Sequence, residues 1–391
     1  MIVRRMRPDE ADRVNALFSV AFEAAPSAGP ADGRSTIRHW GAFTEEGELM
    51  SGLSVTDFTV RFDGKALPMG GVGAVGTFPP FRRRGGVAAC FSAALRELYA
   101  GGTVFSYLYP FSTTYYRRFG YENCVRRLRF TLDLAQLPPP RNRGGFRMLC
   151  PGSGLETAVR KVDEDWEARY NLEVIHGGAG WAEKADPFLS REYTYVWFGE
   201  DGTPLSYLSF RTCAEAEGRN LVCSRFRFTG AAGFDGLLQV FRSLAADHRY
   251  AKFSLHLDGA ILYALPEWSL GALRRETEIA GMVRAVNAAE ALKAAAYRGG
   301  GELCLELRDA LIPENDGRFA IAFAGGRALN VERTEAAPDA VLDIAAFSAM
   351  LAGVCVFSDA AAWMPGVTVC RPDAPLDRLF YRKKLMITDY F

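Results

Sequence analysis

The sequence predicts a multidomain α+β protein, and three observations lead to this prediction. At 391 residues the chain exceeds one ordinary domain, so two or three domains are expected. Hydrophobic residues make up 49% of the chain, which is enough to give each domain a buried core. Segments that alternate apolar and polar residues, as strands do, are interleaved with segments whose apolar residues recur at helical spacing.

The N-terminal part of the chain predicts a sheet with flanking helices. The predicted elements, in order, are strand 2–5, helix 8–22, loop 24–35, strands 49–62 and 71–78, helix 87–98, and strands 103–109 and 126–132. Asp63-Gly64 follows an alternating segment and predicts a tight hairpin turn. We expect the strand at 126–132 to close this first sheet.

Two further segments follow, and a proline- and glycine-rich linker at residues 138–145 separates them from the first. The predicted elements are helices 154–169, 233–246, 288–297 and 344–352, and strands 193–198, 205–211, 221–229, 252–257, 301–307, 318–323, 327–333 and 340–343. The composition changes near Val286, after a segment that repeats the rhythm of the first one. We therefore expect domains at residues 1–137, 146–285 and 286–391.

The stretch from Gly71 to Tyr121 carries the pattern most typical of a ligand site. A small, apolar strand is followed by the turn Arg82-Arg83-Arg84-Gly85-Gly86 and then by a helix. The start of a helix presents unpaired N–H groups and a partial positive charge, glycines let a ligand approach the backbone, and arginines add fork-shaped donors. This combination suits a pyrophosphate. Taken alone, these residues fit a plain basic turn capped by glycine equally well.

Composition narrows the possible partners and location of the protein. Lysine plus arginine and aspartate plus glutamate number 46 each, so nothing favours a nucleic-acid or anionic-membrane partner. No stretch approaches the ~20 apolar residues that span a bilayer. The eight cysteines form no Cys-x-x-Cys pair, which favours reduced cysteines in a cytoplasmic protein. The four histidines lack ligand-like spacing, so no metal is expected.

The turn and its flanks resemble the acetyl-CoA motif of the GCN5-related N-acetyltransferases (GNAT), Gln/Arg-x-x-Gly-x-Gly/Ala after a bulged strand. Arg83-x-x-Gly86-x-Ala88 fits this pattern fully. Arg82-x-x-Gly85-x-Val87 fits it except at the last position. The second segment repeats the rhythm without the basic turn and is similar to a degenerate GNAT copy. The segment after Val286 resembles a sterol-carrier-protein-like (SCP2-like) domain.

This three-part order resembles the Eis-type ("enhanced intracellular survival") N-acetyltransferases over the whole chain. Its most specific further pieces are Tyr116-x-Arg118-Phe119-Gly120-Tyr121 and Thr388-Asp389-Tyr390-Phe391. The resemblance implies tandem GNAT-like domains, with mixed and largely antiparallel sheets and flanking helices, followed by an SCP2-like α+β domain. It also implies an N-acetyltransferase that uses acetyl-CoA as co-substrate and acts on aminoglycosides or protein lysines. Family members assemble as trimers or hexamers, so a homo-oligomer is expected.

The resemblance also assigns catalytic roles. Attack of an amine on a thioester needs a proton acceptor for the amine and a proton donor for the departing thiolate, since a free alkyl amine has a pKa of about 10. The α-carboxylate of Phe391 is implied as the general base and Tyr116 as the general acid. Tyr116 alone also fits a core aromatic in a tyrosine-rich helix, and Phe391 fits a frayed terminus.

Cofactor contacts carry over by position from the same family. The implied set consists of Val75, Gly76 and Thr77 on the strand, Arg83, Arg84, Gly85, Gly86, Val87 and Ala88 at the turn, and Phe111 and Ser112 before the tyrosine helix. The pair Phe111-Ser112 replaces the Ser-Glu of the mycobacterial members, which weakens that contact. Tyr390 stands where those members have an acidic group, and Glu23 and Asp389 could supply charge for a polycationic acceptor instead.

Two function classes therefore remain at this point. The first is an acetyl-CoA-dependent N-acetyltransferase on primary amines. The second is a non-catalytic binding or scaffold protein on a GNAT fold, whose SCP2-like domain holds an apolar ligand. The basic turn, Tyr116 and the terminal carboxylate favour the first.

Overall fold

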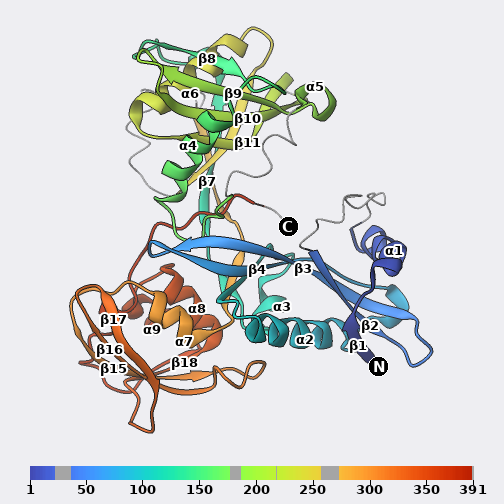
Figure 1. Cartoon of the computed structure of the whole chain (residues 1–391), viewed down its shortest axis with the longest axis vertical. Helices are drawn as coiled ribbons and strands as arrows, with labels where there is room; N and C mark the ends of the chain where they lie inside the picture. The colour runs from blue at the N-terminus through green and yellow to red at the C-terminus, as the bar shows by residue number, and fades with distance from the viewer. Residues whose placement is uncertain (23–36, 177–185, 217, 257–272, 390–391) are drawn as a thin grey trace. The chain divides into compact units, whose positions relative to one another are not determined.

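The computed structural model describes residues 1–22, 37–176, 186–216, 218–256 and 273–389, which form three sheets with flanking helices (Figure 1). The predicted mixed α+β fold is thereby confirmed. The chain divides into two compact units. The first unit comprises Met1–Val125, Ala280–Lys383 and Asp389–Phe391, and the second comprises Arg126–Ile279 and Lys384–Thr388.

The first sheet lies in the first unit and has seven strands. In spatial order they are β1 (Ile2–Arg5), β2 (Ile37–Phe43), β3 (Leu49–Phe62), β4 (Lys65–Thr77), β5 (Phe105–Leu108), β14 (Met282–Ala285) and β6 (Glu122–Asn123). All neighbours pair antiparallel except β4 and β5, which are parallel. The hairpin turn between β3 and β4 is as predicted, because Asp63 and Gly64 both have positive φ, at 47° and 83°.

Two helices cover the faces of this sheet, and each buries its own apolar cluster. Helix α2 (Gly86–Ala100) packs Phe91, Leu95 and Leu98 against sheet residues such as Leu53. Helix α1 (Ala11–Phe22) follows the short 3-10 helix η1 (Pro8–Glu10) and buries Leu17 in a separate cluster. Ala42 of β2 belongs to the α2 cluster and its neighbour Phe43 to the α1 cluster, so the helices lie on opposite faces.

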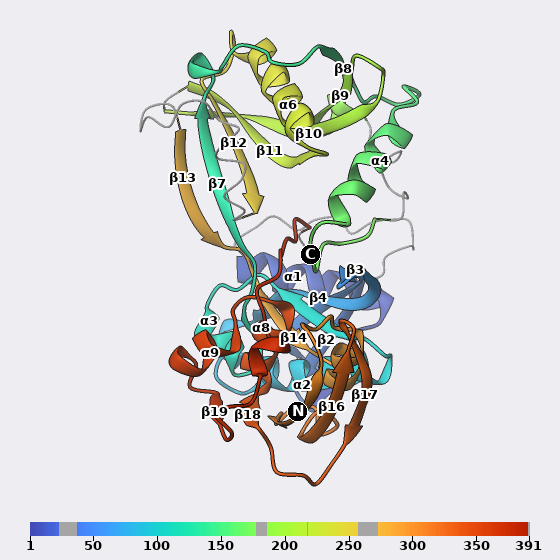
Figure 2. The ribbon, with the colours of Figure 1, turned by 90° about the vertical axis from the view of Figure 1, so that its left-hand side faces the viewer.

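The second unit holds another seven-stranded sheet. Its strands, in spatial order, are β13 (Leu273–Ile279), β7 (Arg126–Asp133), β12 (Tyr250–His256), β11 (Gly218–Phe228), β10 (Pro204–Glu215), β9 (Tyr193–Gly199) and β8 (Gly144–Met148). Helix α6 (Ala231–Leu244) and helix α4 (Glu156–Glu167) flank it (Figure 2). Leu208 of β10 belongs to the α6 cluster and its neighbour Tyr207 to the α4 cluster, so the helices cover opposite faces.

One strand assignment was wrong. Residues 126–132 form the predicted strand, but β7 pairs with β12 and β13 and so belongs to the second sheet. The reason is that alternation along a strand indicates a half-buried surface and does not indicate which distant strand will pair with it.

The second sheet repeats the central arrangement of the first. In both, a strand, a helix and a parallel strand follow each other: β4, α2, β5 in the first and β11, α6, β12 in the second. The turn before α6 carries Gly230 and no arginine, whereas the turn before α2 carries three. The second sheet therefore has the same strand–helix–strand order without a basic turn.

The third sheet completes the first unit with five strands and three helices. The strands, in spatial order, are β17 (Arg327–Arg333), β16 (Gly317–Ala324), β15 (Gly301–Arg308), β18 (Ala340–Asp343) and β19 (Val367–Val369). The helices are α7 (Ala288–Ala294), α8 (Ile344–Ala352) and α9 (Phe357–Trp363). Helix α8 is buried throughout and packs against β14 of the first sheet. Short elements elsewhere are α3 (Thr113–Arg117), α5 (Pro187–Ser190), η2 (Pro79–Phe81), η3 (Leu134–Gln136) and η5 (Leu376–Arg378).

None of the helices in the described ranges is long and apolar enough to cross a membrane. All eight cysteines are free thiols.

Candidate functional site

Strand β4 is bulged and separates from its neighbour at its C-terminal end. Gly52 lies opposite Gly76 and Ser54 opposite Gly73, so the single residue Leu53 opposes two residues of β4. One of the two, Ala74, has a φ of 49°. Pairing with β5 ends at Val72, so residues 73–77 continue past the last β5 pair. An extended ligand with amide groups can pair with such an edge.

The basic turn leads from this edge into the start of α2. Arg83 and Gly85 have positive φ, 64° and 82°, and Gly85 is the residue at which the helix is capped. The first α-helical hydrogen bond runs from the Ala89 N–H to the Gly85 carbonyl at 3.0 Å. The N–H groups of residues 86–88 therefore precede the helical ladder and are available to an anion.

Gly86 has no room for a side chain. A Cβ atom there would lie 2.5 Å from the Ser51 Oγ and 2.9 Å from the Ser51 Cβ. The helix thus starts directly against β3, where the Ser51 hydroxyl bonds that of Thr77 at 2.9 Å. This close approach keeps the turn narrow beside the bulged edge.

A cleft of about 360 Å³ lies at this helix start, entirely within the first unit. Of the predicted cofactor residues, it is lined by Thr77, Arg83, Gly85, Gly86, Val87 and Ala88. It is also lined by Ser51, Phe81, Tyr115, Arg118 and Phe119, which sequence reasoning did not assign to the cofactor. No acidic side chain appears among these described lining residues, and the two arginines leave the cleft positively charged. Together with the helix start, this charge suits phosphate groups.

The other predicted cofactor residues lie around this cleft without lining it. Val75 and Gly76 lie on the separated end of β4, and Gly76 packs against α1. The Arg84 guanidinium lies 5.5 Å from the centroid of the Phe81 ring. Ser112 caps α3 by accepting the Tyr115 N–H at 3.4 Å, and Phe111 is 74% exposed.

Tyr116 lies in the core next to this cleft. Its residue is 3% exposed, and its ring centroid is 6.0 Å from that of Phe91 and 5.3 Å from those of Phe111 and Tyr115. Burial raises the pKa of the Tyr116 phenol, and the neighbouring phenols of Tyr115 and Tyr121 raise it further. The phenol is therefore held in its protonated form. Tyr115, by contrast, lines the cleft itself.

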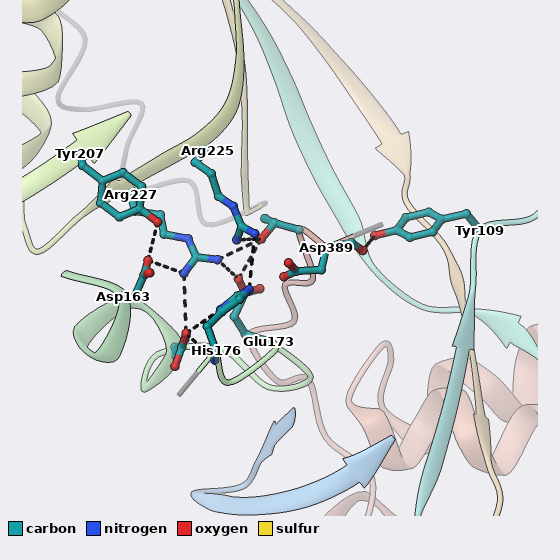
Figure 3. Close-up of polar contacts among 10 residues, drawn as sticks. Tyr109, Asp163, Glu173, His176, Tyr207, Arg225, Arg227 and Asp389 are labelled. Carbon is teal, nitrogen blue, oxygen red and sulfur yellow. Dashed lines mark hydrogen bonds and ion pairs between the residues drawn. The ribbon is translucent and has the colours of Figure 1, made fainter. Parts of the chain in front are cut away.

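The predicted base, Phe391, lies outside the described residues, as do Tyr390, Glu23 and the loop 24–35. Of the residues just before Phe391, Asp389 belongs to the first unit and Thr388 to the second. In the first unit, the Tyr109 hydroxyl donates to the Asp389 carbonyl at 2.7 Å (Figure 3). In the second unit, the Thr388 hydroxyl donates to Glu173 Oε1 at 2.9 Å and accepts from Arg227 at 3.1 Å.

Two further observations concern the rest of the described residues. Within the described residues, no group of three or more His, Cys, Asp and Glu side chains is placed to hold a metal ion. A cleft of about 590 Å³ beside the third sheet is lined largely by charged residues, among them Glu306, Arg308, Asp316, Arg318 and Glu335. Such a lining does not suit an apolar ligand.

Comparison with known proteins agrees with this geometry. Residues 2–124 match the family model described as an acetyltransferase (GNAT) domain, and residues 288–384 match the model of a sterol carrier protein domain. A relative described as an uncharacterized N-acetyltransferase from Streptomyces avermitilis is 23% identical over 366 residues, covering 90% of this chain and 86% of the relative.

Solved structures share the fold over the whole chain. A conserved protein from Enterococcus faecalis V583, described as a probable N-acyltransferase, aligns with a TM-score of 0.85 at 20% identity, covering 100% of this chain and 99% of that one. Eis1 from Mycobacterium abscessus aligns with a TM-score of 0.81 at 20% identity, covering 100% of both chains.

Proposed function

We propose that this chain, an N-acetyltransferase of the GNAT type, transfers the acetyl group of acetyl-CoA to primary amines of aminoglycoside-like polyamines or lysine side chains. The observation that carries the proposal is the cleft at the start of α2. It combines unpaired helix N–H groups, Arg83 and Arg118, and the separated end of β4. The helix start suits the pyrophosphate of coenzyme A, and the strand edge suits the amides of its pantetheine arm.

In the proposed reaction, the amine nitrogen attacks the thioester carbonyl, forming the C–N bond. The C–S bond then breaks, and coenzyme A leaves as a thiolate. We propose that the Phe391 carboxylate takes the proton from the amine and that the Tyr116 phenol protonates the thiolate. Burial raises the pKa of Tyr116, so the phenol is protonated at neutral pH, as a general acid must be before it reacts.

The first experiment is a thermal melt with acetyl-CoA, which stabilises the folded protein in proportion to the logarithm of ligand concentration over Kd. Turnover is then followed by thiol release over a panel of aminoglycosides, polyamines and lysine peptides. The absence of turnover with every amine in the panel would contradict the proposal, whether or not acetyl-CoA shifts the melting temperature.

The acid role is tested by a matched pair of variants. We expect Tyr116→Phe to lower kcat by about 100-fold while leaving the Kd of acetyl-CoA within about threefold, since general acid catalysis contributes roughly 10²–10⁴-fold. Tyr115→Phe removes the neighbouring phenol that lines the cleft and is expected to keep most of the kcat. If Tyr115→Phe has the larger effect on kcat, the acid is Tyr115.

The base role is tested by adding one residue after Phe391. This change moves the carboxylate and leaves the residues of the cleft unaltered. We expect kcat to fall and acetyl-CoA binding to persist. Undiminished turnover would remove the terminal carboxylate from the mechanism.

We further propose a cytoplasmic homo-oligomer with GNAT-like, degenerate GNAT-like and SCP2-like domains. The eight free thiols support a reducing compartment. The GNAT and sterol carrier matches at residues 2–124 and 288–384 support the outer two domains. Light scattering of the purified chain measures the oligomeric state, and a monomeric mass would contradict that part.

A further inference from the structure

A buried ion pair joins the third sheet to the first within the first unit. Arg284 of β14 and Asp309, which follows β15, each expose about 1% of their side chains. One guanidinium nitrogen, Nη2, donates to both carboxylate oxygens of Asp309, at 2.7 and 2.6 Å. The same carboxylate accepts the N–H groups of Leu311 and Ile312 at 3.0 and 3.2 Å. Asp309 is thus fixed by its own loop and presents its charge to Arg284.

The second arm of the guanidinium reaches a different element. Arg284 Nη1 donates to the backbone carbonyl of Phe119 at 2.5 Å. The next residue, Gly120, has a φ of 77°, and a Cβ there would lie 1.9 Å from the same nitrogen. The turn after α3 therefore rests directly on the guanidinium, and only glycine leaves room for this contact.

This turn is part of the cofactor cleft. Arg118 and Phe119 line the cleft, as does Tyr115 one helical turn earlier. The Phe119 ring stacks on Phe91 of α2 with centroids 4.3 Å apart. The Phe119 N–H bonds the Tyr116 carbonyl at 2.9 Å, so a shift of this residue shifts the turn that carries the proposed acid.

We propose that Arg284 and Asp309 are positioning residues of the acetyl-CoA site, through which the sterol-carrier-like part of the chain holds the Tyr115–Phe119 wall of the cleft in place. The inference rests on the proposed function for the identity of the ligand. It assigns this C-terminal part a role in the transferase site, independent of any apolar ligand.

The two contacts require the planar guanidinium group of an arginine. One arm serves a carboxylate and the other a carbonyl on a separate element, and a lysine ammonium on a flexible stem cannot hold both in the same geometry. Arg284→Lys therefore keeps a positive charge beside Asp309 and loses the bond to the Phe119 carbonyl. This variant separates positioning from charge balance.

The experiment compares the full-length chain with Arg284→Lys and with Arg127→Lys as a matched control. Arg127 is 5% exposed and pairs with Glu278 at 2.8 Å in the second unit. We expect Arg284→Lys to weaken acetyl-CoA binding by about tenfold in calorimetry and to lower kcat by about tenfold. Amide hydrogen exchange of the peptide spanning residues 116–121 is expected to accelerate. Arg127→Lys is expected to leave all three quantities within about twofold.

A second variant covers the case in which Arg284→Lys does not fold. Gly120→Ala places a methyl group against the guanidinium and is expected to weaken acetyl-CoA binding by a similar factor. Where both single variants fold, their effects should be less than additive when combined, since both break the same contact. The inference would be overturned if a variant that folds binds acetyl-CoA as tightly as wild type and shows wild-type amide hydrogen exchange at residues 116–121. If acetyl-CoA binds and no amine is acetylated, the proposed function fails, and the affinity and exchange measurements still decide the positioning role.

Discussion

Replacing Arg227 by methionine is expected to destabilise the second unit strongly. The Arg227 side chain on β11 is 1% exposed and bonds Asp163 at 2.7 Å and Glu173 at 2.6 Å (Figure 3). The side chains of these acids are 5% and 0% exposed. Methionine has a similar volume, so the change removes the cation bonded to both carboxylates and opens little cavity.

The magnitude follows from burial. Removing one partner of a buried ion pair costs about 3–5 kcal/mol, because the remaining charge stays desolvated. An exposed pair contributes ~0–1 kcal/mol. Arg211→Met is the matched control, since Arg211 lies on β10 in the same unit and is 62% exposed in its pair with Glu192. At about 2–4 °C per kcal/mol for a unit of this size, Arg227→Met should lower its melting temperature by roughly 6–20 °C.

The assay is thermal and urea unfolding followed by circular dichroism, in which the two units are free to unfold in separate transitions. Equal losses of stability in the Arg227 and Arg211 variants would refute this reasoning.

Three further predictions concern the first unit. Bonds from the Arg4 side chain and the Arg7 N–H lower the pKa of Glu10 from 4.5 to about 2. The stability that the Glu10 charge provides is therefore present above pH 4.5 and lost as the pH falls to 2. The unfolding free energies of Glu10→Gln and wild type, measured by urea titration, should converge over this range. Gly86→Ala is expected to weaken acetyl-CoA binding about tenfold or more in calorimetry, because the new methyl group would collide with Ser51, and unchanged affinity would contradict the close approach. Burial raises the pKa of Tyr116 above the ordinary value of 10, so its phenol should not lose its proton between pH 7 and 9. The pH profiles of kcat for wild type and Tyr116→Phe should therefore have the same shape over this range, and a fall in kcat seen only in wild type would contradict this prediction.

Local sequence patterns predicted most elements of the fold. The hairpin at Asp63-Gly64 and the amphipathic pattern of α2 are determined by neighbouring residues, so they could be read directly. Strand β14 was missed because its four residues are all buried and therefore show no alternation. The strand at 126–132 was placed in the wrong sheet because its partners, β12 and β13, lie more than a hundred residues later in the chain.

The candidate site divides in the same way. The basic turn and its glycines were predicted because a helix start and a permissive backbone are local properties. Ser51 and Arg118 reach the same cleft from other elements, and no spacing in the sequence brings them there. The acetyl-CoA contacts themselves, the acid role of Tyr116 and the base role of Phe391 stay predictions.

The position of β14 in the first sheet has a consequence for biosynthesis. Strand β14 lies between β5 and β6 and pairs with both. The four residues of β14 are synthesised about 160 residues after β6, on the order of ten seconds or more later at ordinary translation speed. Until then the nascent N-terminal half has an open strand edge at β5, the kind of edge that recruits other chains or chaperones. A gene fragment that ends at residues 138–145 would keep that edge permanently and is a poor choice for producing the N-terminal part alone.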